Sequence, residues 1–131
     1  GMAFQKPVVG WISSGYGIRI DPFSGKERFH RGVDIAANKG AVVSATQGGK
    51  VVAAGWQNYL GNYIIISHYV ANYSSVYGHL HSFAVNRGDL VNRGQQIGTV
   101  GSTGKSTGPH LHFEIRRYNN QLDPEKLIMG L

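Results

Sequence analysis

The stretch Asn62-Tyr63-Ile64-Ile65-Ile66-Ser67-His68 decides the fold class of this chain. Its β-branched isoleucines lose side-chain freedom in a helix and pack well on a pleated sheet. A short apolar run of this length is typical of a buried strand. We therefore predict a strand over residues 62–68.

Further strands are predicted on both sides of this stretch. Gly49–Gly55 encloses Lys-Val-Val-Ala-Ala, and Gln95–Val100 reads Gln-Gln-Ile-Gly-Thr-Val. Ser75–Leu80 and His110–Ile115 are two more candidates. Their spacing is close to the roughly 8–12 residues expected of an all-β sandwich or barrel. No helical pattern of ten or more residues is present, except a weak one at Pro124–Leu131.

The composition agrees with a turn-rich β protein. The chain has 131 residues, of which 41% are apolar, so it can fill one hydrophobic core, and we predict a single domain over residues 1–131. Nineteen glycines and only 15% charged residues argue against a helical bundle. Gly1 before Met2 is expected to be a remnant of cloning. No stretch approaches the ~18 apolar residues of a membrane span, and no signal peptide is visible.

The net charge of +6 favours polyanionic partners, such as nucleic acid, an anionic membrane surface or an acidic bacterial wall polymer. The basic residues are dispersed, with Arg116-Arg117 the only adjacent pair, so an ordinary solubilising charge explains them equally well. Aromatic residues could interleave with basic ones on a nucleic-acid surface, yet no RNA- or DNA-binding motif accompanies them. We therefore predict no nucleic-acid partner.

Histidine clusters are the chemically informative feature. Five of the six histidines fall into three short segments, which are His30-Arg31-Gly32-Val33-Asp34, His79-Leu80-His81 and His110-Leu111-His112. Histidine and aspartate at short spacings are typical ligands of zinc. Because the chain has no cysteine, it can form neither a disulfide nor a thiolate zinc site.

The segment His110-Leu111-His112-Phe113-Glu114 alternates polar and apolar residues. In a strand, alternate side chains share a face, so His110, His112 and Glu114 would point one way and Leu111 and Phe113 the other. Both imidazoles could reach a metal, or one could bind it while the other faces the substrate. A half-exposed strand with incidental histidines is the alternative for this segment taken alone.

His30 and Asp34 stand four residues apart, with Gly32 between them, and could be presented from a turn or a loop that enters a strand. Alone, the pair fits a solvated loop. Combined with the His-x-His segment, it gives two histidines, one carboxylate and an open fourth position for water, which is a catalytic zinc pattern. Such a zinc lowers the pKa of bound water to roughly 7 and polarises a carbonyl.

No His-Glu-x-x-His helix is present, so another group must handle protons. A spare histidine is suitable, because its ordinary pKa near 6.5 lies close to working pH. His79 follows Tyr77-Gly78 and is such a candidate. His68 ends a very apolar strand and is predicted to be a structural, hydrogen-bonding histidine, while His81 is predicted to be incidental.

Taken together, these residues resemble the lysostaphin- and LytM-type zinc endopeptidases, which cut the peptide part of peptidoglycan. The resemblance runs from about Ile12 to Pro124. It rests on these matched segments: Ser13-Ser14-Gly15-Tyr16-Gly17-Ile18-Arg19, His30-x-x-x-Asp34, Tyr77-Gly78-His79-Leu80, Gly88-Asp89-x-Val91-x-x-Gly94-Gln95-x-Ile97-Gly98 and Ser102-Thr103-Gly104-x-Ser106-Thr107-Gly108-Pro109-His110-Leu111-His112-Phe113-Glu114.

The resemblance implies an all-β, antiparallel sandwich or barrel-like fold of the duplicated hybrid-motif type, with a narrow active-site groove. It implies that one zinc ion is bound by His30, Asp34 and His112. His79 and His110 would then be the unligated pair that assists the water and steadies the oxyanion. Glu114 could orient a ligand imidazole. Arg19 and Asp21 also match, without an assigned role.

A zinc metalloendopeptidase acting on peptidoglycan stem peptides or cross-links is therefore expected, with D-alanyl–diaminopimelate cross-links favoured over glycine bridges. The alternative is a non-catalytic wall-binding or amidase-activating module, since some family members lack metal ligands. This chain keeps all three implied ligands and both helper histidines. The resemblance also implies a periplasmic or extracellular, wall-associated location, and a monomer is favoured.

Overall fold

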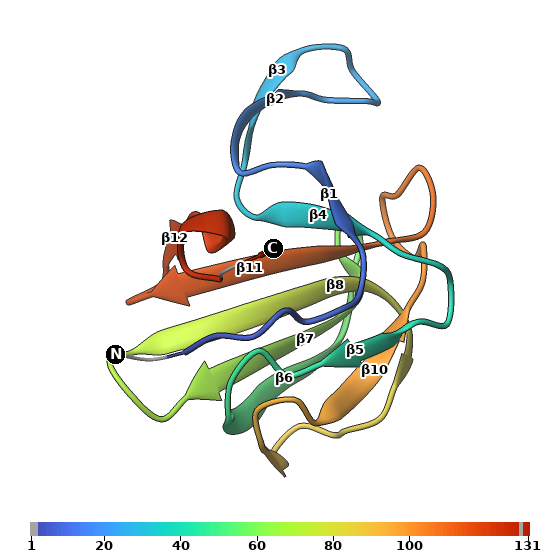
Figure 1. The fold of residues 1–131 in the computed structure, drawn as a ribbon. Helices are drawn as coiled ribbons and strands as arrows, with labels where there is room; N and C mark the ends of the chain where they lie inside the picture. Colours follow the sequence, from blue (N-terminus) through green and yellow to red (C-terminus); the bar gives the residue numbers. More distant parts are fainter. Residues whose placement is uncertain (1–2, 129) are drawn as a thin grey trace.

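The computed structural model describes residues 3–128 and 130–131 and is built almost entirely of strands (Figure 1). The elements are β1 (Trp11–Ser14), β2 (Gly17–Ile20), β3 (Glu27–His30), β4 (Val33–Ala36), β5 (Val42–Ser44), β6 (Gly49–Gln57), β7 (Gly61–His68), β8 (Tyr73–Phe83), β9 (Leu90–Val91), β10 (Gln96–Val100), β11 (His110–Arg117), β12 (Asn120–Leu122) and η1 (Pro124–Lys126). The predicted all-β fold is confirmed.

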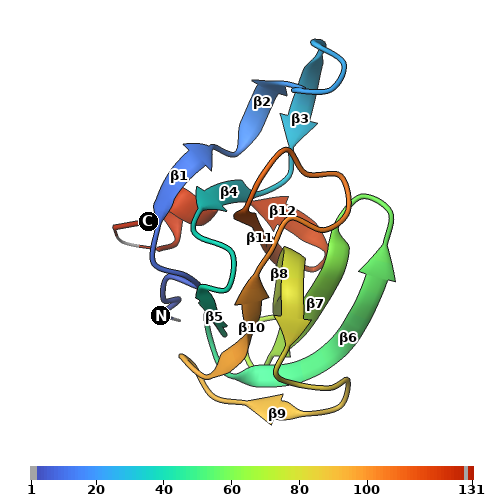
Figure 2. The same cartoon turned by 90° about the vertical axis from the view of Figure 1, so that its right-hand side faces the viewer.

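Ten strands form one antiparallel sheet with the order β1-β4-β11-β8-β7-β6-β9. β12 joins the edge of β11, while β10 pairs with both β5 and β8 and so branches from the main order. β2 and β3 form a separate two-stranded hairpin, which projects away from the main sheet (Figures 1 and 2). Consecutive strands β6, β7 and β8 are neighbours, as short connections between antiparallel strands allow.

Each strand predicted from the sequence exists, and most extend a few residues further. The decisive run lies in β7, where Ile64 and Ile66 are fully buried. Of the weakly helical segment Pro124–Leu131, only Pro124–Lys126 forms a turn of 3-10 helix among the described residues. Asp123 caps this turn by accepting a hydrogen bond from the Glu125 backbone N–H. None of the described helical segments is long and apolar enough to cross a membrane.

Strand alternation divides β4 and β11 between the core and a pocket. Leu111, Phe113 and Ile115 of β11 are fully buried in the hydrophobic core, together with Val33 and Ile35 of β4. Each such side chain contributes about 1.5–3 kcal/mol through burial alone. The residues that alternate with these buried ones on both strands face the opposite side of the sheet. The core therefore fixes the strands that present the candidate site.

Candidate active site

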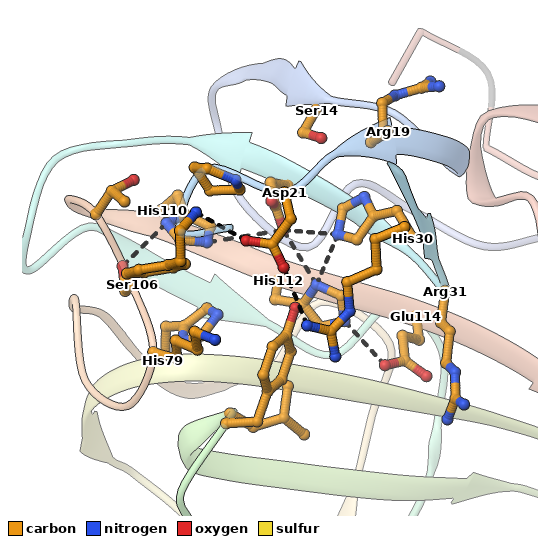
Figure 3. Close-up of a pocket in the computed structure, with 18 of the residues that line it drawn as sticks. Ser14, Arg19, Asp21, His30, Arg31, His79, Ser106, His110, His112 and Glu114 are labelled. Carbon is orange, nitrogen blue, oxygen red and sulfur yellow. Dashed lines mark hydrogen bonds and ion pairs between the residues drawn. The ribbon is translucent and has the colours of Figure 1, made fainter. Parts of the chain in front are cut away.

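Two neighbouring strands carry the side chains at the centre of the site. The register of β4 and β11 places Asp34 directly opposite His112. His30 ends β3, and the turn at Arg31-Gly32 leads from it into β4. These side chains line an open pocket of about 640 Å³ (Figure 3). Residues of the hairpin β2–β3 and of the loops before β7 and β11 form the rest of its wall.

Three donor atoms converge at the centre of this pocket. His30 Nε2 lies 3.3 Å from Asp34 Oδ1 and 3.3 Å from His112 Nδ1. His112 Nδ1 lies 3.0 Å from the same Asp34 oxygen. Tetrahedral zinc with ligands at about 2.0–2.1 Å holds neighbouring donors about 3.3 Å apart. The three atoms therefore already have the mutual spacing that a tetrahedral zinc ion requires, and they are the metal-compatible group found among the described residues.

The outward-facing nitrogens of both imidazoles have partners that fix the ring orientation. His30 Nδ1 donates to the Gly15 carbonyl oxygen at 2.9 Å, which leaves the lone pair of Nε2 directed at the centre. His112 Nε2 donates to Glu114 Oε2 at 2.8 Å, which leaves Nδ1 facing Asp34. The hydrogen-bond partners assign the His30 tautomer and fix the orientation of the His112 ring. An acceptor behind each ligand imidazole is the usual support of a metal site.

Glu114 connects the centre to a cation. Its Oε1 accepts hydrogen bonds from Arg116 Nε at 3.0 Å and Nη2 at 2.9 Å, while Oε2 faces His112. Burial would raise the pKa of Glu114, but the hydrogen bond with His112 and the Arg116 guanidinium hold that pKa below its usual range. Glu114 is therefore a buried carboxylate that orients His112, a role that the sequence had left open.

His79 reaches the pocket because β8 is bulged beside it. Asn62 pairs with Leu80 and Ile64 with Tyr77, so this interval of β8 holds one residue more than that of β7. His79 adopts a φ of 61°, in the left-handed region that non-glycine residues rarely occupy. The bulge lets Tyr77 and Leu80 both enter the core while His79 lines the pocket.

His79 and His110 form a second imidazole pair beside the three donors. Their ring centroids are 4.6 Å apart, and His110 Nε2 lies 3.7 Å from Asp34 Oδ1. His79 Nδ1 donates to the Thr103 carbonyl oxygen at 2.7 Å, and His110 Nδ1 to that of Gly108 at 2.8 Å. Both Nε2 atoms therefore keep a free lone pair. Figure 3 shows the two rings at one end of the pocket, near Ser106.

The electrostatics of the centre favour charge on Asp34 and His112. Burial would raise the pKa of Asp34, but hydrogen bonds with His112 and His30 outweigh it and hold that pKa far below its usual range. Burial likewise opposes the His112 imidazolium, yet hydrogen bonds with Asp34 and Glu114 raise the pKa of His112 to about 9. Burial, with a contribution from His110, lowers the pKa of His79 to about 4.

These shifts predict the pH dependence of stability for protein stripped of metal by a chelator. A group whose pKa is raised on folding stabilises the folded state below its unfolded pKa, and that contribution disappears as pH rises through the folded pKa. For His112 the interval runs from 6.5 to about 9, which corresponds to about 3 kcal/mol. We expect urea unfolding to give a lower free energy of unfolding above pH 9 than just below pH 6.5.

Between pH 6.5 and about 9 the effect belongs to His112, because Asp34 and Glu114 are ionised in both states there and the lowered pKa values of His79 and His68 act only below 6.5. The matched control is His112→Gln, which keeps a side chain of similar length without the titrating ring. This variant should lose the difference between the two pH values. Equal stabilities for the parent protein at both would contradict the assignment of a protonated His112.

Two histidines lie outside the pocket, as predicted. His68 is buried and hydrogen-bonds the Gly48 carbonyl oxygen and Ser75 Oγ, both at 2.8 Å, so it is a structural histidine. His81 is exposed and does not line the pocket.

The structure also gives Asp21 a local role. Its carboxylate accepts hydrogen bonds from the Phe23 backbone N–H at 2.7 Å and from Arg28 at 3.0 Å, and these bonds shape the turn between β2 and β3.

Several groups around the pocket were not predicted from the sequence. Arg28 of β3 lies 5.4 Å from the Tyr59 ring centroid, and Lys105 lies 4.8 Å from that of Phe23. The first contact joins the hairpin to the β6–β7 turn, and the second joins it to the loop before β11. The carbonyl oxygens of Gly15 and Thr103 were missed as well, because a backbone acceptor leaves no residue-type signal.

Comparison with known proteins finds similarity to peptidases along most of the chain. Residues 28–124 match the model of peptidase family M23. The chain is 42% identical over 116 residues to the peptidoglycan DD-endopeptidase ShyB of Vibrio cholerae, which covers 88% of this chain and 27% of ShyB. The chain thus spans about a quarter of the length of that relative.

Solved structures share the fold. A zinc-containing peptidase from Vibrio cholerae superposes with a TM-score of 0.85 and 41% identity, covering 93% of this chain and 39% of the other. The catalytic domain of lysostaphin from Staphylococcus simulans gives a TM-score of 0.81 and 38% identity, covering 89% and 90% of the two chains. The resemblance noted in the sequence is therefore confirmed, and the chain belongs to peptidase family M23.

Proposed function

We propose that this chain is a zinc endopeptidase that hydrolyses peptide bonds in the stem peptides or cross-links of peptidoglycan, in the cell wall outside the cytoplasm. The observation that carries the proposal is the convergence of His30 Nε2, Asp34 Oδ1 and His112 Nδ1 at 3.0–3.3 Å beside two further imidazoles. The names of the peptidoglycan DD-endopeptidases ShyB and ShyC among its relatives support the choice of substrate.

In this proposal His30, Asp34 and His112 hold one zinc ion. Two imidazoles and one carboxylate are a suitable donor set for zinc, and their donor atoms lie within 4.8 Å of one another, so these residues would hold the ion. When bound, zinc supplies a Lewis acid that acidifies water and polarises the scissile carbonyl.

His79 and His110 divide the proton transfer and the stabilisation of the oxyanion between them. Each ring is fixed through Nδ1, so each presents a free Nε2 to the pocket. One Nε2 accepts a proton as water attacks the scissile carbonyl carbon, and that proton passes to the amine nitrogen when the C–N bond breaks. The second Nε2, when protonated, donates a hydrogen bond to the negative charge that develops on the carbonyl oxygen.

The direct test is release of soluble muropeptides from purified peptidoglycan, with and without a chelator, read by mass spectrometry. We expect release that stops on chelation and returns with zinc, and the fragment masses would identify the bond. Absence of release from zinc-loaded protein would overturn the peptidase proposal. It would favour the alternative, a wall-binding or amidase-activating module, which an added amidase would then reveal.

The support that Glu114 gives to His112 leads to a further prediction. Glu114→Gln keeps the size of the side chain but removes the charge that fixes His112 Nε2–H, so zinc affinity should fall about 10–100-fold. The measurement is competition with a chromophoric chelator. Glu27→Gln is the matched control, because Glu27 is exposed on β3 and does not line the pocket. Unchanged zinc affinity in Glu114→Gln would contradict the orienting role.

A further inference from the structure

The pocket holds more cationic than anionic side chains. Its lining includes three carboxylates, Asp21, Asp34 and Glu114, and five cations, Arg19, Arg28, Arg31, Lys105 and Arg116. Each carboxylate is already engaged within the protein. Asp21 pairs with Arg28, Glu114 with Arg116, and Asp34 with the ligand imidazoles. The side chains that line the pocket therefore carry more positive than negative charge, five cations against three carboxylates.

Arg31 differs from the other cations of the pocket. Arg28 and Arg116 are paired with carboxylates, Lys105 lies over the Phe23 ring, and Arg19 donates to the Ile18 carbonyl oxygen. The Arg31 guanidinium is exposed, and no hydrogen bond, ion pair or aromatic contact joins it to any residue in 3–128 or 130–131. Its five N–H donors are thus available to a ligand.

The base of the Arg31 side chain is held in place by its neighbours. It directly follows His30, and a Cβ atom at Gly32 would come within 2.2 Å of the Phe113 carbonyl oxygen and 2.8 Å of Glu114 Cγ. The backbone at this turn therefore packs directly against β11 and has no room to move towards it. Figure 3 shows Arg31 beyond Glu114, at the end of the pocket opposite His79 and His110.

We infer that Arg31 binds a free carboxylate of the substrate next to the scissile bond. A guanidinium binds a carboxylate through two parallel hydrogen bonds, which gives both attraction and orientation. The inference rests on the proposed function and narrows its substrate class. Cross-links whose residue beside the scissile bond carries a free carboxylate are preferred, whereas neutral bonds inside a glycine bridge lack the group that Arg31 recognises.

The test uses two synthetic cross-linked peptides that are identical except that this carboxylate is free in one and a carboxamide in the other. With zinc-loaded protein, kcat/KM should favour the carboxylate peptide about tenfold to a hundredfold, the range of charge-assisted hydrogen bonds. Arg31→Gln should bring the ratio of the two kcat/KM values close to one. Zinc content, measured in the same samples, should equal that of the parent protein.

Two control variants locate the effect. Arg87→Gln removes an exposed arginine that does not line the pocket, and should keep the ratio. Lys105→Gln removes a cation from the loop before β11, and should also keep most of it. A ratio near one in the parent protein would overturn the inference, and so would a ratio lost in Lys105→Gln but kept in Arg31→Gln.

A binding measurement separates this inference from the proposed function. Chelated protein, which cannot hydrolyse the peptides, should bind the carboxylate peptide about tenfold tighter than the carboxamide peptide, and Arg31→Gln should remove the difference. If neither peptide is cut by zinc-loaded protein but this binding difference is present, the peptidase proposal fails and the carboxylate site stands. If both are cut and bound equally, the carboxylate site fails and the peptidase proposal stands.

Discussion

Replacement of His112 by alanine is expected to abolish both zinc binding and peptidoglycan hydrolysis. His112 Nδ1 is 3.0 Å from Asp34 Oδ1 and 3.3 Å from His30 Nε2, so its removal takes one corner from the three-donor group. Zinc sites in proteins use at least three protein ligands, so the two remaining donors are not expected to hold the ion. We expect zinc content near zero by mass spectrometry and a fall in hydrolysis of about a thousandfold or more.

Loss of folding must be separated from loss of metal, because His112 is buried between Asp34 and Glu114. His30→Ala removes a less buried member of the three-donor group, and on the proposed function it should give the same loss of zinc and activity. His81→Ala is the matched control, since His81 is exposed outside the pocket and should keep both properties. Hydrolysis by either ligand variant at the parent rate, with its thermal transition intact, would refute the zinc assignment.

The strands that the sequence predicted share a physical cause. β6, β7, β8, β10 and β11 carry β-branched or alternating apolar residues, and their buried side chains form the core. The hairpin β2–β3 was not predicted, because its four-residue strands are mostly exposed and show no alternation of burial. Its turn depends on hydrogen bonds to the Asp21 carboxylate, and such local contacts do not produce a periodic pattern.

Sequence reasoning predicted which side chains line the pocket where the strand is regular. It could not do so where a bulge interrupts the strand. Alternation alone placed His110, His112 and Glu114 on one face of β11, and all three line the pocket. The same rule applied to β8 would put His79 on the side of Tyr77, which lies in the core. Only the bulge at His79, with its positive φ, turns this side chain into the pocket.

The spacing of residues in the sequence also could not predict that β3 and β4 lie close to β11. His30 and His112 are separated by 82 positions, and their meeting depends on the register that sets Asp34 opposite His112. The resemblance to a known family implied a ligand set for the expected zinc ion, which spacing had left open. The backbone acceptors at Gly15 and Thr103 became visible only in the structure, because any residue type can supply a carbonyl oxygen.

Replacement of His79 by alanine is expected to leave zinc bound and to remove most of the rate. His79 does not belong to the three-donor group, and its Nδ1 is bonded to the Thr103 carbonyl oxygen. Zinc content should therefore equal that of the parent protein. Loss of a positioned general acid–base group costs about 10²–10⁴-fold in kcat. His79→Ala with full activity would show that the proton transfers are performed elsewhere.

Comparison of single and double variants decides whether His79 and His110 act as one unit. Their ring centroids are 4.6 Å apart, and both present Nε2 to the same end of the pocket. If the two imidazoles serve consecutive steps of one proton transfer, the double variant should be hardly slower than either single variant, since groups that act together are not additive. Multiplicative losses would instead indicate two independent roles, with one imidazole moving the proton and the other stabilising the charge on the carbonyl oxygen. The proposed division of labour predicts the second result, with zinc content unchanged in all three variants.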